Sequence, residues 1–175
     1  MQRERGIGRL VASLARGALA IGCAAQALFV AHAWAATATD SFDVTATVVA
    51  SCIVSAVDLP FGAYDPTSAT PLDQATTVAV TCTNGTGYTV GLDKGEGTGA
   101  SIASRRMQDA GANQLVYSLY KDAGRSSLWG DSGGQTVSGT GTGAQQTLDV
   151  YGRVPIHQAA IAGAYEDTVI VTVTY

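Results

Sequence analysis

Short segments with a two-residue apolar repeat recur along this chain, and no segment has the period of an amphipathic helix. β-Branched and aromatic residues are enriched in these segments, and glycine, proline or asparagine separates them. The sequence therefore predicts seven strands, which are 41–48, 52–57, 76–82, 88–92, 115–120, 147–151 and 168–175. Seven short strands in one domain are typical of an antiparallel sandwich, so we expect an all-β fold and exclude a helical bundle.

The first and last expected strands each have one apolar face. The apolar residues of the first strand are Phe42, Val44, Ala46 and Val48. Those of the last strand are Val169, Val171, Val173 and Tyr175. We expect the edge of the last strand to stay open, and an unpaired apolar edge is normally an aggregation hazard. A detachable strand at the other end of the same chain indicates a protein that polymerises by lending strands.

The first 35 residues have the composition of an export signal. Four arginines precede an almost wholly apolar stretch, 17–30, and Ala33-Trp34-Ala35 offers a cleavage site. We expect cleavage after Ala35, which removes 35 of the 175 residues and leaves 140, enough for one domain with a real core. A lipidation box ending at Cys23 is a poorer match, because Ala20 stands where a larger aliphatic residue is expected.

Loss of the signal changes both the cysteine count and the charge. Cys52 and Cys82 remain, and they can pair in an oxidising compartment, with two reduced thiols as the alternative. Such a bridge would stabilise the fold by about 3–4 kcal/mol. Four of the 10 basic residues and one of the 14 acidic residues leave with the signal, so 6 face 13 and the net charge becomes −7. A surface of that charge repels phosphate backbones, so no nucleic-acid partner is expected.

Two glycine-rich segments, 93–99 and 130–143, are expected to be surface loops. The second contains Gly-Asp-Ser-Gly-Gly, the sequence around the nucleophile of chymotrypsin-like serine proteases. The one histidine left after the signal, His157, follows Ser132, whereas in those proteases the histidine precedes the serine. A serine hydrolase is therefore disfavoured, and we expect Ser132 to lie in a flexible turn.

No other pattern predicts a catalytic, metal or cofactor site. One histidine and two cysteines supply no metal-ligand cluster. Asp93 and Glu96 are expected to be solvated carboxylates rather than a glycosidase pair. We likewise expect Arg105 and Arg106 to form a solvated pair beside a strand. The sequence therefore predicts a protein without enzymatic activity and without a cofactor.

A series of segments, in this order, resembles the spore coat protein U family. The segments are 41–48 with Ser51-Cys52, 61–66, 80–93, 105–107, 115–122, 128–130, 150–155 and 165–169. The resemblance covers nearly all of the chain after the signal. Members of that family include Csu-type subunits of archaic chaperone–usher pili, whose immunoglobulin-like sandwich lacks its last strand. A periplasmic chaperone fills the gap in transit, and the N-terminal strand of the next subunit then replaces it.

The resemblance implies a division into a signal (1–35), a donor-strand segment (36–49) and a sandwich (50–175). The implied donor anchors are Phe42, Val44, Ala46 and Val48, and the implied acceptor wall, which also contacts the chaperone, is Val169, Val171, Val173 and Tyr175. The two cysteines resemble the family's disulfide between the first two strands. The implied partners are a periplasmic chaperone, an outer-membrane usher and neighbouring pilus subunits. The implied location is the cell surface after passage through the periplasm, with a role in adhesion or biofilm formation.

A self-contained secreted sandwich is the alternative reading. In that case the chain is a coat or ligand-binding protein whose own first strand closes its sheet. Composition does not separate the two readings, because seven strands suffice for either one.

Overall fold

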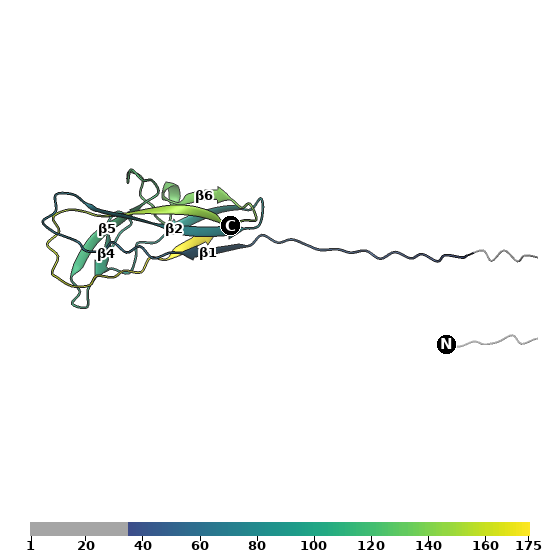
Figure 1. Cartoon of the computed structure of the whole chain (residues 1–175), viewed down its shortest axis with the longest axis horizontal. Helices are drawn as coiled ribbons and strands as arrows, with labels where there is room; N and C mark the ends of the chain where they lie inside the picture. Colours follow the sequence, from purple (N-terminus) through teal and green to yellow (C-terminus); the bar gives the residue numbers. More distant parts are fainter. Residues whose placement is uncertain (1–34) are drawn as a thin grey trace, which may run out of the picture. The chain divides into compact units, whose positions relative to one another are not determined.

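The computed structural model describes residues 35–175, so the export signal expected over 1–35 lies outside the described residues except for Ala35. The chain divides into a first unit that ends at Val44 and a second unit, Thr45–Tyr175. All regular secondary structure of the described residues lies in the second unit. Figure 1 shows this unit as a stack of strands with long connecting loops.

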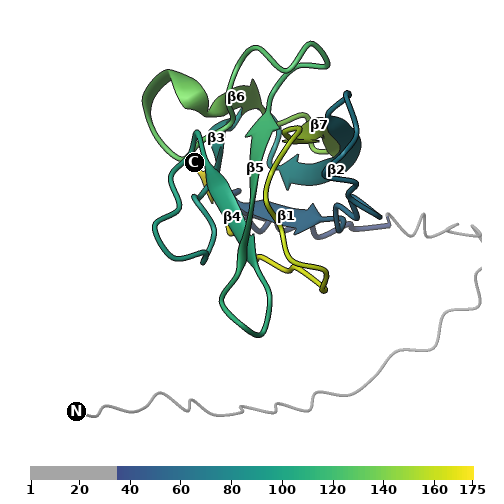
Figure 2. The same ribbon diagram turned by 90° about the vertical axis from the view of Figure 1, so that its left-hand side faces the viewer.

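In the part of the chain that the structure describes, eight strands form two antiparallel sheets. The strands are β1 (Cys52–Ala56), β2 (Leu72–Cys82), β3 (Gly87–Leu92), β4 (Arg105–Gln108), β5 (Gln114–Tyr120), β6 (Val137–Thr140), β7 (Gln146–Val154) and β8 (Val171–Thr174). The larger sheet has the order β1-β2-β7-β5-β4, and the smaller sheet has the order β6-β3-β8. In Figure 2, β2 and β7 of the larger sheet lie on one side and β3 and β6 of the smaller sheet lie on the other. The all-β, immunoglobulin-like sandwich expected from the sequence is therefore confirmed.

The core lies between the two sheets and follows the alternation of the strands. Val78, Val80 and Cys82 of β2 are buried, and Tyr88, Val90 and Leu92 of β3 face them. Trp129, in the loop after β5, is fully buried, and its Nε1 donates to the carbonyl oxygen of Val90 at 3.0 Å. That bond satisfies the indole group inside an apolar core.

A disulfide joins β1 to β2 at one end of the sandwich. Cys52 and Cys82 stand opposite each other in the register of the two strands and are bonded, with their Cα atoms 4.1 Å apart. The pairing expected from the sequence is present, and the alternative of two reduced thiols is not. We call this end of the sandwich, where the arm of residues 35–51 begins, the disulfide end.

All six predicted strands that form have different bounds in the structure, and β2, β7 and β8 differ by three residues or more at one end. β2 begins at Leu72 rather than Thr76, because Asp73 lies opposite Arg153 of β7 and accepts two hydrogen bonds from its guanidinium group, both at 2.7 Å. β8 covers only 171–174, since pairing with β3 ends at Leu92 opposite Val171. The two-residue apolar repeat indicates where β2 and β8 lie. It does not indicate where they begin and end, because those bounds depend on the strands with which they pair.

β6 contradicts the expectation that 130–143 is a loop. This strand pairs with β3 from Gly87 to Val90. A Cβ atom at Gly139 would stand 2.5 Å from the Cζ and Oη atoms of Tyr88, so the strand contains a glycine where that ring covers it. The glycine that suggested a loop therefore serves the packing of Tyr88.

β4 was not predicted, and the expectation that Arg105 is solvated is wrong. Its side chain is fully buried, whereas that of Arg106 is half-buried. The Arg105 guanidinium group donates four hydrogen bonds to backbone carbonyl oxygens. The acceptors are Leu92, Asp93, Ile102 and Trp129, at 2.7 to 3.1 Å. A buried cation is tolerated here because its donors are satisfied by carbonyl groups.

The segment 41–48 is not a strand in this structure, contrary to the prediction of a strand there. Residues 35–51 carry no regular secondary structure, and all of their side chains are exposed. Phe42 is 87% exposed, Val44 84% and Val48 83%. A β-strand needs a neighbour to pair its backbone groups, and none of the strands that the structure describes pairs with 41–48.

Candidate functional site

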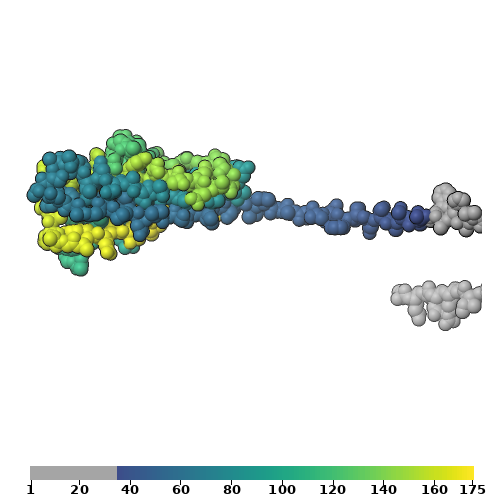
Figure 3. All heavy atoms as spheres, in the orientation of Figure 1, coloured from purple at the N-terminus to yellow at the C-terminus, as the bar shows by residue number. Residues whose placement is uncertain are grey.

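The two sheets leave an open seam between β1 and β8. β1 is the edge of the larger sheet and β8 is the edge of the smaller sheet, and no backbone pairing joins the two strands. In Figure 1 the yellow β8 lies beside the dark-blue β1, and Figure 3 shows the yellow C-terminal segment as a strip along one side of the second unit. Each strand therefore presents one unpaired edge to the seam, as an incomplete sandwich would.

A cavity of about 580 Å³ opens at this seam, and we call it the inner cavity. Its floor consists of core residues from both sheets, which are Val78, Leu92, Met107, Tyr117, Leu119 and Val150. Its mouth is formed by Ala56 and Val57 at the end of β1 and by Val169 and Val171 at the start of β8. The apolar core of the sandwich is thus open on one side.

The implied acceptor wall only partly coincides with this cavity. Val169, Val171 and Val173 are half-buried and pack against the core, whereas Tyr175 is 59% exposed. Val169 and Val171 line the inner cavity, but Val173 and Tyr175 do not. The inner cavity therefore lies beside the beginning of β8.

A second cavity of about 640 Å³ lies beyond the first, and we call it the outer cavity. Its walls include Leu72, the first residue of β2, and Val154, the last residue of β7. These residues mark the loop end of the sandwich, opposite the disulfide end. The remaining wall is made by two loops, 59–66 and 160–166.

The half-buried Leu59 and Phe61 form a divider between the two cavities. Both residues line both cavities, as do Met107 and Tyr165. The Phe61 ring stacks edge-to-face on Tyr117 with centroids 5.9 Å apart. A Cβ atom at Gly152 would stand 2.6 Å from Cζ of Phe61, so the divider depends on a glycine beneath it. No pattern in the sequence predicts the divider, although the segment 61–66 is part of the family resemblance.

Carboxylate groups hold the chain that leads into β8. Asp167 Oδ1 accepts the backbone N–H groups of Glu96 and Thr168, and Asp93 Oδ1 accepts those of Gly95 and Ile170. Asp93 is half-buried, so the expectation of a solvated carboxylate is wrong for it but right for the exposed Glu96. These bonds fix the start of β8, which is the lip of the inner cavity.

A residue on the floor of the inner cavity makes one more hydrogen bond to the chain that leads into β8. The hydroxyl group of Tyr117 donates to Asp167 Oδ2 at 2.7 Å. Burial, and then the hydrogen bond to Asp167, raise the pKa of Tyr117 well above its usual range. Tyr117 therefore stays protonated and acts as a fixed donor.

Thr83 holds the base of the arm against the sandwich. Its Oγ1 donates to the carbonyl oxygen of Val49 at 3.2 Å and accepts the N–H group of Ser51 at 3.1 Å. Its own N–H group donates to the carbonyl oxygen of Ser51 at 2.9 Å. The chain is therefore tied to the disulfide end from Val49 onward, directly after the last implied donor anchor.

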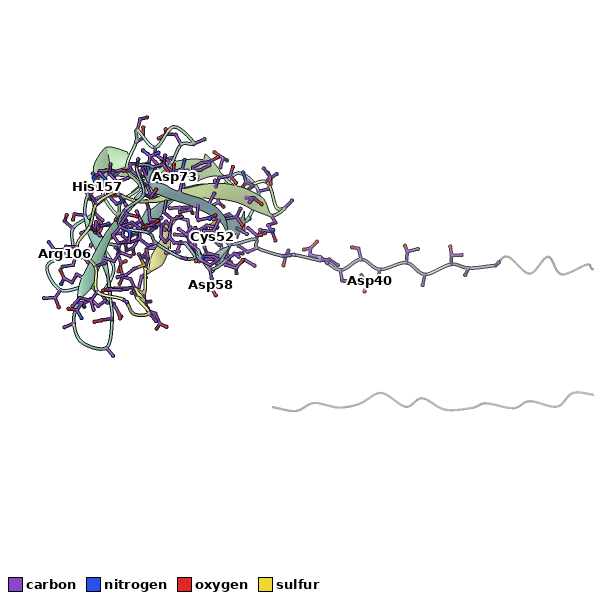
Figure 4. All side chains as sticks on the ribbon, turned by 60° about the vertical axis from the view of Figure 1, so that its left-hand side comes forward. Asp40, Cys52, Asp58, Asp73, Arg106 and His157 are labelled. Carbon is purple, nitrogen blue, oxygen red and sulfur yellow. A yellow bond between two sulfur atoms is a disulfide. The ribbon has the colours of Figure 1, made fainter. Side chains whose placement is uncertain are left out.

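The structure does not assemble the other motifs of the sequence into a site. Ser132 and His157 are both exposed, and no hydrogen bond of the described residues joins them. Figure 4 shows His157 and Arg106 well away from Cys52. Within residues 35–175, no three histidine, cysteine or acidic side chains group as metal ligands would, and no helix has the length and apolar character to cross a membrane.

Comparison with known proteins agrees with this geometry. The Spore Coat Protein U domain matches residues 38–172. Protein U of Myxococcus xanthus is 35% identical over 170 residues, which cover 89% of this chain and 95% of that protein. A chain in the crystal structure of the CsuC–CsuE chaperone–tip adhesion subunit pre-assembly complex, from archaic chaperone–usher Csu pili of Acinetobacter baumannii, is similar with a TM-score of 0.53 and 26% identity. That likeness covers 74% of this chain but only 41% of the matched one. Fold, seam and sequence together show that this chain belongs to the spore coat protein U domain family.

Proposed function

We propose that this protein is a structural subunit of a surface pilus, joined to its neighbours by donated strands. The single observation that carries the proposal is the pairing of an open apolar cavity with a free apolar segment in one chain. The inner cavity exposes core residues between two unpaired strand edges. The segment 41–48 presents Phe42, Val44 and Val48 almost fully exposed and pairs with none of the strands described over residues 35–175.

The energetics of such a joint favour a long-lived fibre. Burial of Phe42, two valines and Ala46 contributes on the order of 5–9 kcal/mol. Backbone hydrogen bonds to the edge of β8 add about 0.5–1.5 kcal/mol each. Association offsets a large part of this total, so resistance to dissociation is expected to be kinetic. Dissociation must expose the whole apolar row at once.

In this proposal the inner cavity also receives a second kind of occupant, which is a strand of a chaperone. A subunit in transit through the periplasm must cover its open core, and a chaperone strand fills it until the next subunit arrives. The similarity to a subunit in a chaperone complex supports this step. An outer-membrane usher then receives the subunit, and the finished pilus serves adhesion or biofilm formation at the cell surface.

The test is electrophoresis in detergent of the exported protein, with and without boiling. We expect a ladder of multimers that collapses to one band on heating. Val44→Arg should abolish the ladder, because a charge in place of an anchor cannot enter an apolar cavity. Thr45→Arg is the matched control, since Thr45 lies on the opposite face of the same segment. A single unheated band at monomer mass for the unmodified protein contradicts the proposal.

A self-contained coat protein is the second candidate, and the name of the family favours it. In that case the segment 41–48 of each molecule closes its own seam. The two functions differ in the same gel, because a self-closed molecule runs as a monomer before and after heating.

A further inference from the structure

The two cavities form one trough along the seam. They share Leu59, Phe61, Met107, Tyr165 and Glu166, so the inner cavity leads past the divider into the outer cavity. The backbone groups of 59–63 and 162–164, on the two walls of the outer cavity, make no hydrogen bond with another described residue. Both walls therefore offer free donors and acceptors to an added extended chain.

The position of the empty space constrains where the anchors of a donor segment can lie. Neither cavity is lined by Val173 or Tyr175, so both cavities lie toward the start of β8 and the loop end. A donor whose Phe42 stood beside Tyr175 and whose Val48 stood beside Val169 would leave the outer cavity empty. Filling the outer cavity instead requires a donor register that is displaced toward the loop end.

The attachment of the arm to its own sandwich also favours a donor register that is displaced toward the loop end. Val49 is already tied to its own sandwich through Thr83, so almost no free chain separates Val48 from the body of the donor molecule. Val48 therefore cannot reach deep into a neighbour. It must occupy the outermost position of the trough, which is the outer cavity.

We propose that the outer cavity is the seat of Val48 from a second copy of this chain. Phe42 and Val44 then fill the inner cavity, and Ala46, the smallest anchor, passes the divider at Leu59 and Phe61. The two large anchors that come first thus fill the inner cavity, the small third anchor passes the divider, and the large fourth anchor fills the outer cavity. The inference rests on the proposed function and specifies the partner and the register of its site.

The direction of the donor follows from this seating. With Val48 at the loop end, the donor runs opposite to β8, and the body of the donor copy stands against loops 59–66 and 160–166. The acceptor's own arm begins at the disulfide end, so each copy receives at one end and donates at the other. Such a head-to-tail contact propagates into an open fibre. A self-closed molecule would instead keep Val48 at the disulfide end and bring Phe42 to the loops.

A bulky side chain in the outer cavity tests the proposal. Ala164 is exposed and lines that cavity, so Ala164→Trp should obstruct Val48 without disturbing the core. We expect the lifetime of unboiled multimers in detergent to fall about tenfold, which corresponds to roughly 1.4 kcal/mol. Val48→Ala in the same chain should restore part of that lifetime, although Val48→Ala alone should shorten it.

Ala159→Trp is the matched control, because Ala159 is exposed in the same loop but lines neither cavity. Ala63→Trp obstructs the opposite wall and replaces Ala164→Trp if that variant does not fold. Multimers of both obstructing variants that live as long as the unmodified ones overturn the inference. A loss of chaperone-bound subunit with unchanged multimers also overturns it, since the chaperone would then be the occupant. Absence of multimers from the unmodified protein contradicts the proposed function instead.

Discussion

The Tyr117 hydroxyl group donates to Asp167 Oδ2 at 2.7 Å and thereby ties β5 of the larger sheet to the chain that enters β8. Tyr117 lies on the floor of the inner cavity, and Asp167 lies at its lip. The bond spans the two sheets at the point where the sandwich is open. It holds the start of β8 in place on the open side of the sandwich.

This bond predicts a specific loss of stability at alkaline pH. An unfolded tyrosine ionises near pH 10, whereas the pKa of Tyr117 in the folded protein is raised by burial and by Asp167. The stabilising contribution is therefore complete below about pH 10 and declines as the pH rises above that value. Tyr117→Phe should lower the free energy of unfolding at pH 7 by about 1–2 kcal/mol and flatten the decline above pH 10. Urea unfolding at several pH values measures both, and an unchanged alkaline slope contradicts the assignment.

The disulfide is expected to stabilise the wall of the seam formed by β1. Replacement of both cysteines, as Cys52→Ser/Cys82→Ser, should lower the free energy of unfolding by about 3–4 kcal/mol, because the unfolded chain regains the freedom of a long loop. The double variant leaves no free thiol to form mixed disulfides. Thermal unfolding compares it with the oxidised protein, and equal midpoints would argue against a structural role for the bridge.

The buried Arg105 is expected to be essential for the loops that surround β4. Arg105→Met removes four hydrogen bonds to carbonyl groups and leaves those acceptors buried. We expect a loss of about 3 kcal/mol or more in the free energy of unfolding, as for other buried groups that lose their partner. Arg106→Met is the control on the neighbouring position, and its half-buried side chain should matter by less than about 1 kcal/mol. Denaturant midpoints of the two variants that coincide contradict this prediction.

Two one-sided variants should assemble only with each other. Val171→Asp places a charge at the mouth of the inner cavity, so this chain should donate but not accept a strand. Val44→Arg should accept but not donate. Each variant alone should yield no multimers, whereas co-expression should yield a heat-labile dimer and nothing longer.

Thr172→Asp serves as the control for the acceptor side, because Thr172 is exposed on the other face of β8. Chains with this substitution should form the full ladder. A ladder beyond the dimer from the mixed one-sided variants would show that another surface joins the subunits.

The sequence predicted the class of fold because the alternation of strands reflects which face is buried, and a single chain displays that pattern without knowledge of its partners. It failed at β4 and β6. The two arginines of β4 suggested solvent, but the structure supplies buried carbonyl groups for Arg105. The glycines near β6 suggested a loop, but the ring of Tyr88 requires Gly139 there.

The chain by itself therefore determined a strand-rich domain, two cysteines free to pair and two apolar rows near its ends. These properties depend on residues that are close in sequence. The tertiary structure alone decided that one cavity lies at the start of β8 and a second beyond the divider, and that Thr83 ties Val49 to the sandwich. Cavities and ties of this kind arise between residues far apart in the chain, and no local pattern encodes their positions.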